Sequence, residues 1–114
     1  MPERRIVITP DPKRVRVFCR DALIADSDRI LSLDEEGHGP VRYFPRADVV
    51  MTTLKSSDHR TRCPYKGEAS YFSIETGGET LENAVWSYEN PIDSVSAIKE
   101  YLAFYPGKVR FSEA

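Results

Sequence analysis

Short segments in which apolar and polar residues alternate run through most of the chain and restrict its fold more than any other feature. In the first of them, Val15, Val17 and Cys19 fall on one face, which is typical of a strand that buries that face. The other strand candidates are residues 22–25, 30–33, 41–44, 68–74, 83–88 and 108–111. Gly77-Gly78 predicts a reversal between two of them. The pattern therefore predicts a mainly β domain, either a curled antiparallel sheet or a small barrel.

One segment has the spacing of an α-helix. In residues 94–102, Val95, Ile98 and either Tyr101 or Leu102 recur on one side, and Asp93 or Ser94 can cap the start. We therefore expect one short helix near the C-terminus. The remaining expectations are loops at residues 35–40 and 55–58, one helical turn at residues 45–48, and either a strand or a short helix at residues 49–54.

The length of 114 residues fits a single domain. Residues 1–13 contain Pro2, Pro10 and Pro12, so we expect an extended N-terminal arm or edge segment there, with one domain over residues 14–114. The sequence has no apolar run long enough to span a bilayer and begins with a polar segment unlike a signal peptide. A cytoplasmic protein with no membrane partner is the expectation.

The net charge of −2 gives no reason to expect a nucleic-acid partner. The charge is nevertheless uneven, because residues 1–20 are rich in arginine and residues 21–40 are rich in aspartate and glutamate. A basic arm can contact phosphate, but two adjacent antiparallel strands of opposite charge can also pair across a hairpin. We favour the hairpin.

Residues 60–71 concentrate the most reactive side chains, and the catalytic candidates Cys63, Lys66 and Glu68 lie there. Arginines and a lysine close to Cys63 would favour its reactive thiolate form, although a free cysteine is more often a buried structural residue. Lys66 and Glu68 fall on one face if a strand begins by Lys66, which would suit acid/base chemistry or the anchoring of an anion. The alternative is a solvated surface pair.

Aromatic rings and cations elsewhere suggest a binding cleft. Trp86 and Tyr88 share a strand face, and Tyr71 and Tyr43 can join them from other strands. Amphipathic rings of this kind suit a pocket that stacks a planar ligand, although they also fill small cores. The ligand-binding candidates are Arg42, Tyr43, Tyr65, Lys66, Tyr71, Trp86 and Tyr88.

No metal site or cofactor is expected. Cys19 and Cys63 lack the paired spacing of a zinc site, and His38 and His59 lie in predicted loops without a second ligand at metal spacing. The sequence also has no glycine-rich phosphate loop and no Rossmann fingerprint.

Four blocks of sequence, at residues 43–49, 61–71, 84–91 and 98–105, resemble the domain-of-unknown-function 427 family in order and spacing. The resemblance covers roughly residues 14–111. It implies a β-tent (Mss4-like) fold, in which two antiparallel sheets meet at an angle, here with one short C-terminal helix. Relatives of that fold include zinc-binding domains, a methionine sulfoxide reductase and a domain with an aromatic cage. This sequence lacks the Cys-x-x-Cys pairs of the zinc-binding members, so their metal is not carried over.

The resemblance implies that the cleft between the two sheets holds the family signature, residues 63–67 and 86–88. Our first hypothesis is a domain that binds a small planar or anionic molecule there. An enzyme that uses Cys63 as a nucleophile or redox centre is the second, and a protein-interaction module with a structural signature is the third. The family's nucleotidyltransferase-like label is a fourth, which the missing carboxylate and glycine pattern disfavours. The sequence leaves open whether any reaction is catalysed and whether the chain forms a homodimer.

Overall fold

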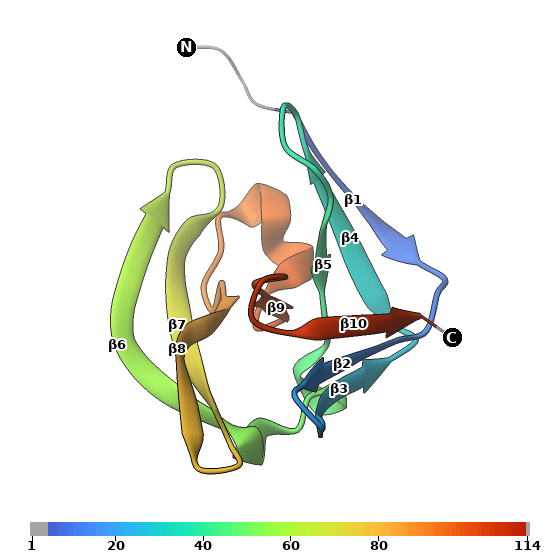
Figure 1. The fold of residues 1–114 in the computed structure, drawn as a ribbon. Coiled ribbons are helices and arrows are strands. Elements are labelled where there is room, and N and C mark those ends of the chain that lie inside the picture. Colours follow the sequence, from blue (N-terminus) through green and yellow to red (C-terminus); the bar gives the residue numbers. More distant parts are fainter. Residues whose placement is uncertain (1–4, 114) are drawn as a thin grey trace.

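The computed structural model describes residues 5–113 and shows antiparallel strands joined by short turns (Figure 1). The strands are β1 (Ile6–Asp11), β2 (Val15–Cys19), β3 (Ala22–Ser27), β4 (Ile30–Glu35), β5 (Val41–Tyr43), β6 (Leu54–Cys63), β7 (Gly67–Thr76), β8 (Glu79–Ser87), β9 (Leu102–Phe104) and β10 (Arg110–Glu113). Short 3-10 segments are η1 (Arg46–Asp48), η2 (Met51–Thr53) and η3 (Asp93–Ile98). The predicted mainly β architecture and the helical turn at residues 45–48 are confirmed.

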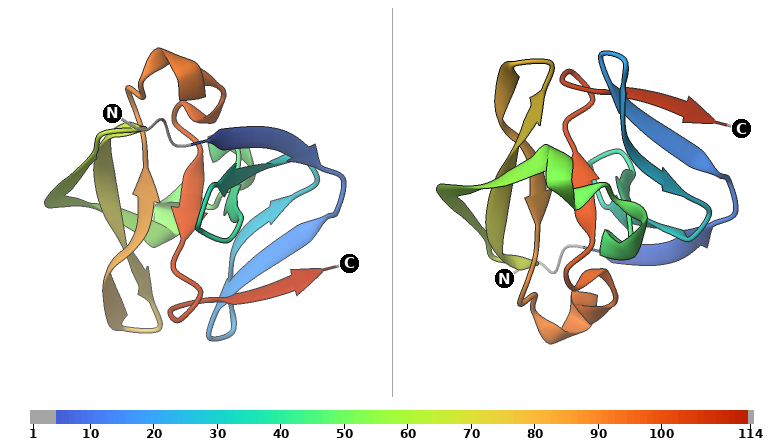
Figure 2. Two further views of the ribbon diagram at one scale, coloured as in Figure 1. Left: turned by 90° about the horizontal axis from the view of Figure 1, so that it is seen from above. Right: turned by 90° about the horizontal axis from the view of Figure 1, so that it is seen from below.

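The strands form three small sheets, where the family resemblance implied two. Their strand orders are β1-β4-β5, β10-β2-β3 and β6-β7-β8-β9. Short strand β9 joins the halves of the molecule, because it pairs with β8 and also meets the chain beside β5 through a bridge between Phe44 and Leu102. It lies between the two halves in every view (Figures 1 and 2). The free edge of β5 is thereby held against the larger sheet, which sets one boundary of the site described below.

The α-helix expected over residues 94–102 is absent, which corrects the sequence prediction. The segment forms the 3-10 turns of η3, interrupted at Val95 by backbone angles of −121° and 26°. Glu100 then takes a φ of 65°, a left-handed conformation that ends any right-handed helix, and Leu102 already belongs to β9. Val95 and Ile98 are buried all the same. Two buried side chains three residues apart fit a 3-10 turn as well as an α-helix, so their spacing alone could not distinguish the two.

One expected loop, at residues 55–58, is part of a strand, whereas the loop expected at residues 35–40 is present but begins one residue later. Residues 55–58 lie in β6, a polar edge strand paired only with β7, with an irregular register between Ser56 and Arg60. Polar residues on both faces suit such an edge because no second layer covers it. Strand β4 continues to Glu35, which pairs with Ile6 of β1. Residues 6–11 of the expected arm thus form an edge strand.

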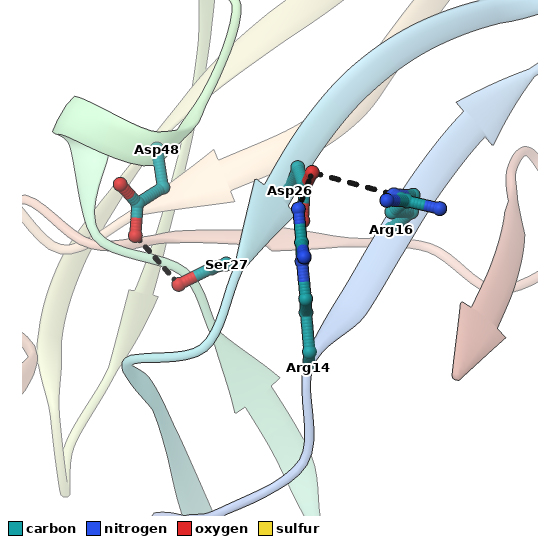
Figure 3. Close-up of polar contacts among 5 residues, drawn as sticks. All are labelled: Arg14, Arg16, Asp26, Ser27 and Asp48. Atoms are coloured by element: carbon teal, nitrogen blue, oxygen red, sulfur yellow. Dashed lines mark hydrogen bonds and ion pairs between the residues drawn. The ribbon is translucent and has the colours of Figure 1, made fainter. Parts of the chain in front are cut away.

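Figure 3 shows the charges that join β2 and β3. The Arg14 side chain donates hydrogen bonds of 2.9 and 2.8 Å to the Asp26 carboxylate, and Arg16 Nε donates a third of 3.3 Å. The hydrogen bond from Arg14 is the main reason that the pKa of Asp26 falls to about 2. The pairing of oppositely charged strands across a hairpin is therefore confirmed. Ser27 Oγ donates to Asp48 at 2.7 Å and so ties this hairpin to η1.

The buried residues form two clusters. The first contains the predicted inward face of β2, where Val15, Val17 and Cys19 are each no more than 1% exposed. The second contains Tyr43 and Tyr71 together with Val95 and Ile98 of η3. Within residues 5–113 no helix has the length and apolar character needed to cross a membrane.

Candidate functional site

A cavity of about 210 Å³ opens between the sheet β1-β4-β5 and the larger sheet, and we call it the aromatic pocket. It is lined by Leu33, Glu35, His38, Gly39, Val41, Tyr43, Lys66, Tyr71, Trp86, Tyr88 and Tyr105. Strands β4 and β5 supply one wall, β7 and β8 supply the other, and the turn after β6 contributes Lys66. Side chains far apart in sequence meet here because the edge of β5 faces β8 and β9.

The pocket brings together most of the predicted ligand-binding residues, since Tyr43, Lys66, Tyr71, Trp86 and Tyr88 all line it. Their role in binding stays a prediction.

The other two binding candidates lie elsewhere. Tyr65 is half-buried in the turn before Lys66 and is not part of the lining. Arg42 points into a neighbouring hollow of about 300 Å³, which shares Trp86 with the aromatic pocket. Its guanidinium pairs with Asp11 at 3.6 Å and with Glu113. Arg42 therefore ties β5 to β1 and β10.

Trp86 forms the centre of the aromatic wall. Its Nε1 donates a hydrogen bond of 3.3 Å to the Tyr43 hydroxyl, and the two rings meet edge to face at 6.5 Å. On the other side of Trp86, the centroid of the Tyr105 ring lies 4.6 Å from the centroid of the Trp86 ring. Burial raises the pKa of Tyr43 to about 12, so this phenol stays neutral at physiological pH. The wall is therefore a set of uncharged rings with polar tips.

Two further phenols complete the pocket. The Tyr71 hydroxyl shares a hydrogen bond of 2.8 Å with Thr61, and its ring lies 4.6 Å from that of His59. Tyr88 is 6% exposed, and burial raises the pKa of its phenol. No hydrogen bond joins the Tyr88 hydroxyl to another residue in the described range 5–113. That hydroxyl is available to a molecule in the pocket.

A buried ion pair forms the polar end of the pocket. Lys66 Nζ lies 2.6 Å from Glu35 Oε1, and their side chains are 11% and 9% exposed. The turn that carries Lys66 is held by a hydrogen bond of 2.9 Å from the Ile92 amide to the Lys66 carbonyl. Sequence reasoning missed Glu35 because it placed this residue in a loop. The sequence did contain an indication of this position, because Leu33 and Glu35 fall on the same face of β4 once that strand continues to residue 35.

Lys66 and Glu68 do not meet. Strand β7 begins at Gly67, so Lys66 lies in the turn and the condition for a shared strand face is not met. Gly67, which lies between them, has a φ of 115°, so the backbone changes direction from Lys66 to Glu68. Glu68 is exposed and lines a separate hollow that also contains Arg62 and Glu89.

Cys63 lies at the end of β6 as a free, half-buried thiol packed beside the second cluster. Cys19 is buried, and burial raises the pKa of its thiol. Among the residues that the structure describes, no group of three histidine, cysteine, aspartate or glutamate side chains is placed to hold a metal ion.

Arg46 links the backbone segments that support the pocket. Its guanidinium donates to Ser87 Oγ at 3.2 Å and to the Glu100 carbonyl at 3.0 Å, and it lies 5.5 Å above the Phe72 ring. These contacts fix the end of β8, which carries Trp86 and is followed directly by Tyr88.

The fold and the pocket define a class: small antiparallel β domains with an aromatic cavity between two sheets. Residues 7–113 match a family described as a domain of unknown function (DUF427), whose name is NTP_transf_9. The chain belongs to this family, as the sequence blocks predicted. A comparison with curated proteins found no match.

Proposed function

We propose that this domain binds a small planar molecule in the aromatic pocket. One observation carries the proposal: the rings of Tyr43, Trp86 and Tyr88 surround a cavity that also contains a buried ion pair. Apolar walls with a few convergent polar groups are the usual composition of a small-molecule site. The free hydroxyl of Tyr88 adds a hydrogen-bonding group that the fold itself does not use.

The size of the cavity limits the ligand. Drug-sized ligands occupy pockets of roughly 300–1,000 Å³. At about 210 Å³, the aromatic pocket suits a single ring with a few substituents. The distance of 4.6 Å between the Trp86 and Tyr105 rings shows that this wall is already packed, so a ring would lie against it without entering between the two side chains.

The β-tent resemblance of the sequence is part of this proposal. In that architecture the cleft between two sheets is the expected position of the family signature. The position of Lys66, Trp86 and Tyr88 in a cavity between β4-β5 and β7-β8 supports the same cleft as the binding site here.

Trp86 provides a direct test, because it is the single tryptophan of the chain. A library of one-ring planar compounds is screened by Trp86 fluorescence and by thermal unfolding. A compound at about a hundred times its dissociation constant adds roughly 2.7 kcal/mol of stability if it binds only the folded state. We expect hits that change both signals.

Tyr88→Phe and Tyr101→Phe form a matched pair for each hit. Both remove one phenolic hydroxyl, but Tyr101 does not line the pocket. Weaker binding to Tyr88→Phe alone supports the site. Equal binding to both variants and to the unmodified protein, or a library without hits, contradicts the proposal.

A further inference from the structure

Three side chains in the aromatic pocket carry N–H or O–H groups for which residues 5–113 provide no acceptor. They belong to Tyr43, Lys66 and Tyr88. We infer that the ligand is a ring bearing an oxygen acceptor of the carbonyl type, and that this oxygen accepts hydrogen bonds from Lys66 and Tyr88. This inference rests on the proposed function and specifies the ligand class of the same pocket.

Lys66 is held at one end of the cavity with donors to spare. Its Nζ lies 2.6 Å from Glu35 Oε1, and its side chain is 11% exposed. An ammonium has three N–H groups, and the contact with Glu35 uses one of them. Within residues 5–113 Nζ makes no other hydrogen bond. A ligand oxygen therefore meets donors that the fold has already removed from most of the solvent.

Two phenols add further donors. The Tyr43 hydroxyl accepts the indole N–H of Trp86 at 3.3 Å, and its own proton has no acceptor among the described residues. The Tyr88 hydroxyl makes no hydrogen bond in that part of the chain, and Tyr88 is 6% exposed. Burial raises the pKa of Tyr43 to about 12 and also raises the pKa of Tyr88. Both phenols therefore keep their protons at neutral pH.

The direction of these hydrogen bonds favours an acceptor on the ligand. A phenol can donate or accept, whereas an ammonium can donate but has no lone pair with which to accept. A ligand oxygen can therefore use both Tyr88 and Lys66, and a carbonyl oxygen has the two lone pairs that this needs. At about 210 Å³ the cavity suits a single ring, so both side chains contact the same small molecule.

Acetophenone and α-methylstyrene form a matched pair of probes, because a CH₂ group in the second replaces the carbonyl oxygen of the first and the shape is nearly the same. Binding is measured by calorimetry and by chemical-shift changes of the pocket residues. If apolar contact alone drove binding, α-methylstyrene would bind more tightly, because its burial leaves no polar group without a hydrogen bond. We expect the opposite order, with acetophenone at least about threefold tighter.

Tyr88→Phe tests one of the two donors, because it removes the hydroxyl and keeps the ring. It is expected to weaken acetophenone binding by about threefold or more and to leave α-methylstyrene binding unchanged. Tyr101→Phe is the control, because Tyr101 does not line the pocket, and it should change neither. Circular dichroism establishes that each variant is folded. If Tyr88→Phe does not fold, the order of the two probes on the unmodified protein decides.

Each outcome has a distinct meaning. Acetophenone binding that is tighter than that of α-methylstyrene, and that is weakened by Tyr88→Phe, supports the inference. If α-methylstyrene binds as tightly as acetophenone or more tightly, the inference is overturned and the proposed function stands. An unchanged preference in folded Tyr88→Phe also overturns it. If neither probe binds up to its solubility limit, the proposed function fails together with the inference.

Discussion

Lys66 Nζ lies 2.6 Å from Glu35 Oε1, and this contact joins the turn after β6 to the end of β4, 31 residues earlier in the chain. Both side chains are buried. A buried charge that loses its partner retains the cost of its desolvation, whereas removing both charges removes that cost. The pair thus makes the turn and the strand dependent on each other.

The first prediction follows from that dependence. Lys66→Met and Glu35→Gln should each lower the free energy of unfolding by roughly 3 kcal/mol, because each removes one member of a buried ion pair and keeps the other charge buried. The double variant should recover most of this loss. Urea unfolding of the four proteins gives the coupling free energy. Losses that simply add in the double variant would show that the two charges do not stabilise each other.

Gly67→Ala should also destabilise the fold. Gly67 has a φ of 115°, which L side chains rarely adopt, and an added Cβ would lie 3.5 Å from the backbone of residues 90–92. Strain of this kind costs about 1–3 kcal/mol. Gly107→Ala is the matched control because the space around that residue is open and its φ is not in this region. Thermal unfolding should separate the two variants, and equal melting temperatures would contradict the prediction.

Arg46→Lys should be destabilising even though the charge is kept. The planar guanidinium donates hydrogen bonds to both Ser87 Oγ and the Glu100 carbonyl, and a lysine cannot reproduce that geometry. Ser87 is fully buried, so loss of its partner should cost about 1–3 kcal/mol. Arg62→Lys, at an exposed position on β6, should change stability by less than about 0.5 kcal/mol. Chemical denaturation of both variants tests the contrast.

Acid should weaken the β2–β3 hairpin. The pKa of Asp26 is lowered from 3.8 to about 2 in the fold, so its stabilising contribution is present above about pH 4 and is lost as the pH falls through about 2. Asp26→Asn lacks that contribution at every pH. The stability difference between the two proteins should therefore shrink from pH 6 to pH 2. Melting temperatures across that range measure it, and a constant difference would exclude Asp26 as its source.

The two thiols should differ in accessibility. Cys63 is half-buried and free, whereas Cys19 is 1% exposed and burial raises its pKa. A thiol reagent should therefore modify Cys63 in the folded protein and both cysteines in denaturant. Mass spectrometry identifies the modified residue. Labelling of Cys19 in the folded state at a similar rate would contradict the burial of β2.

The alternation of side chains was sufficient to predict most of the strands, because a one-sided sheet imposes a period of two. It also placed Trp86 and Tyr88 on one face, and the pocket contains both. The prediction of an α-helix over residues 94–102 is wrong. The spacing of Val95 and Ile98 requires only that one side of the segment is buried, and a 3-10 turn also provides such a side. Nothing local in the sequence indicates that Glu100 takes a positive φ.

The ion pair could not be predicted from local sequence. The sequence suggests Glu68 as the partner of Lys66 because the two residues are close together in the chain. The partner in the structure is Glu35, which lies on another sheet. Such a pairing depends on how β4 and the turn after β6 are brought together, and that arrangement is set by the packing of the whole molecule. If the buried face of β4 is extended by one more alternate position, Glu35 is a charged residue on a buried face. That pattern does not identify Lys66 as its partner.

The position of β10 has a consequence for how the chain is made. Strand β2 lies between β3 and β10, so its partner on one side follows within a few residues and the other comes from residues 110–113. During synthesis the β2–β3 hairpin therefore has an open strand edge until residues 110–113 have left the ribosome. Open edges pair readily with other chains. The last strand thus covers the edge of β2 and becomes the outer strand of the sheet, and a chain cut before Arg110 would keep the β2 edge exposed.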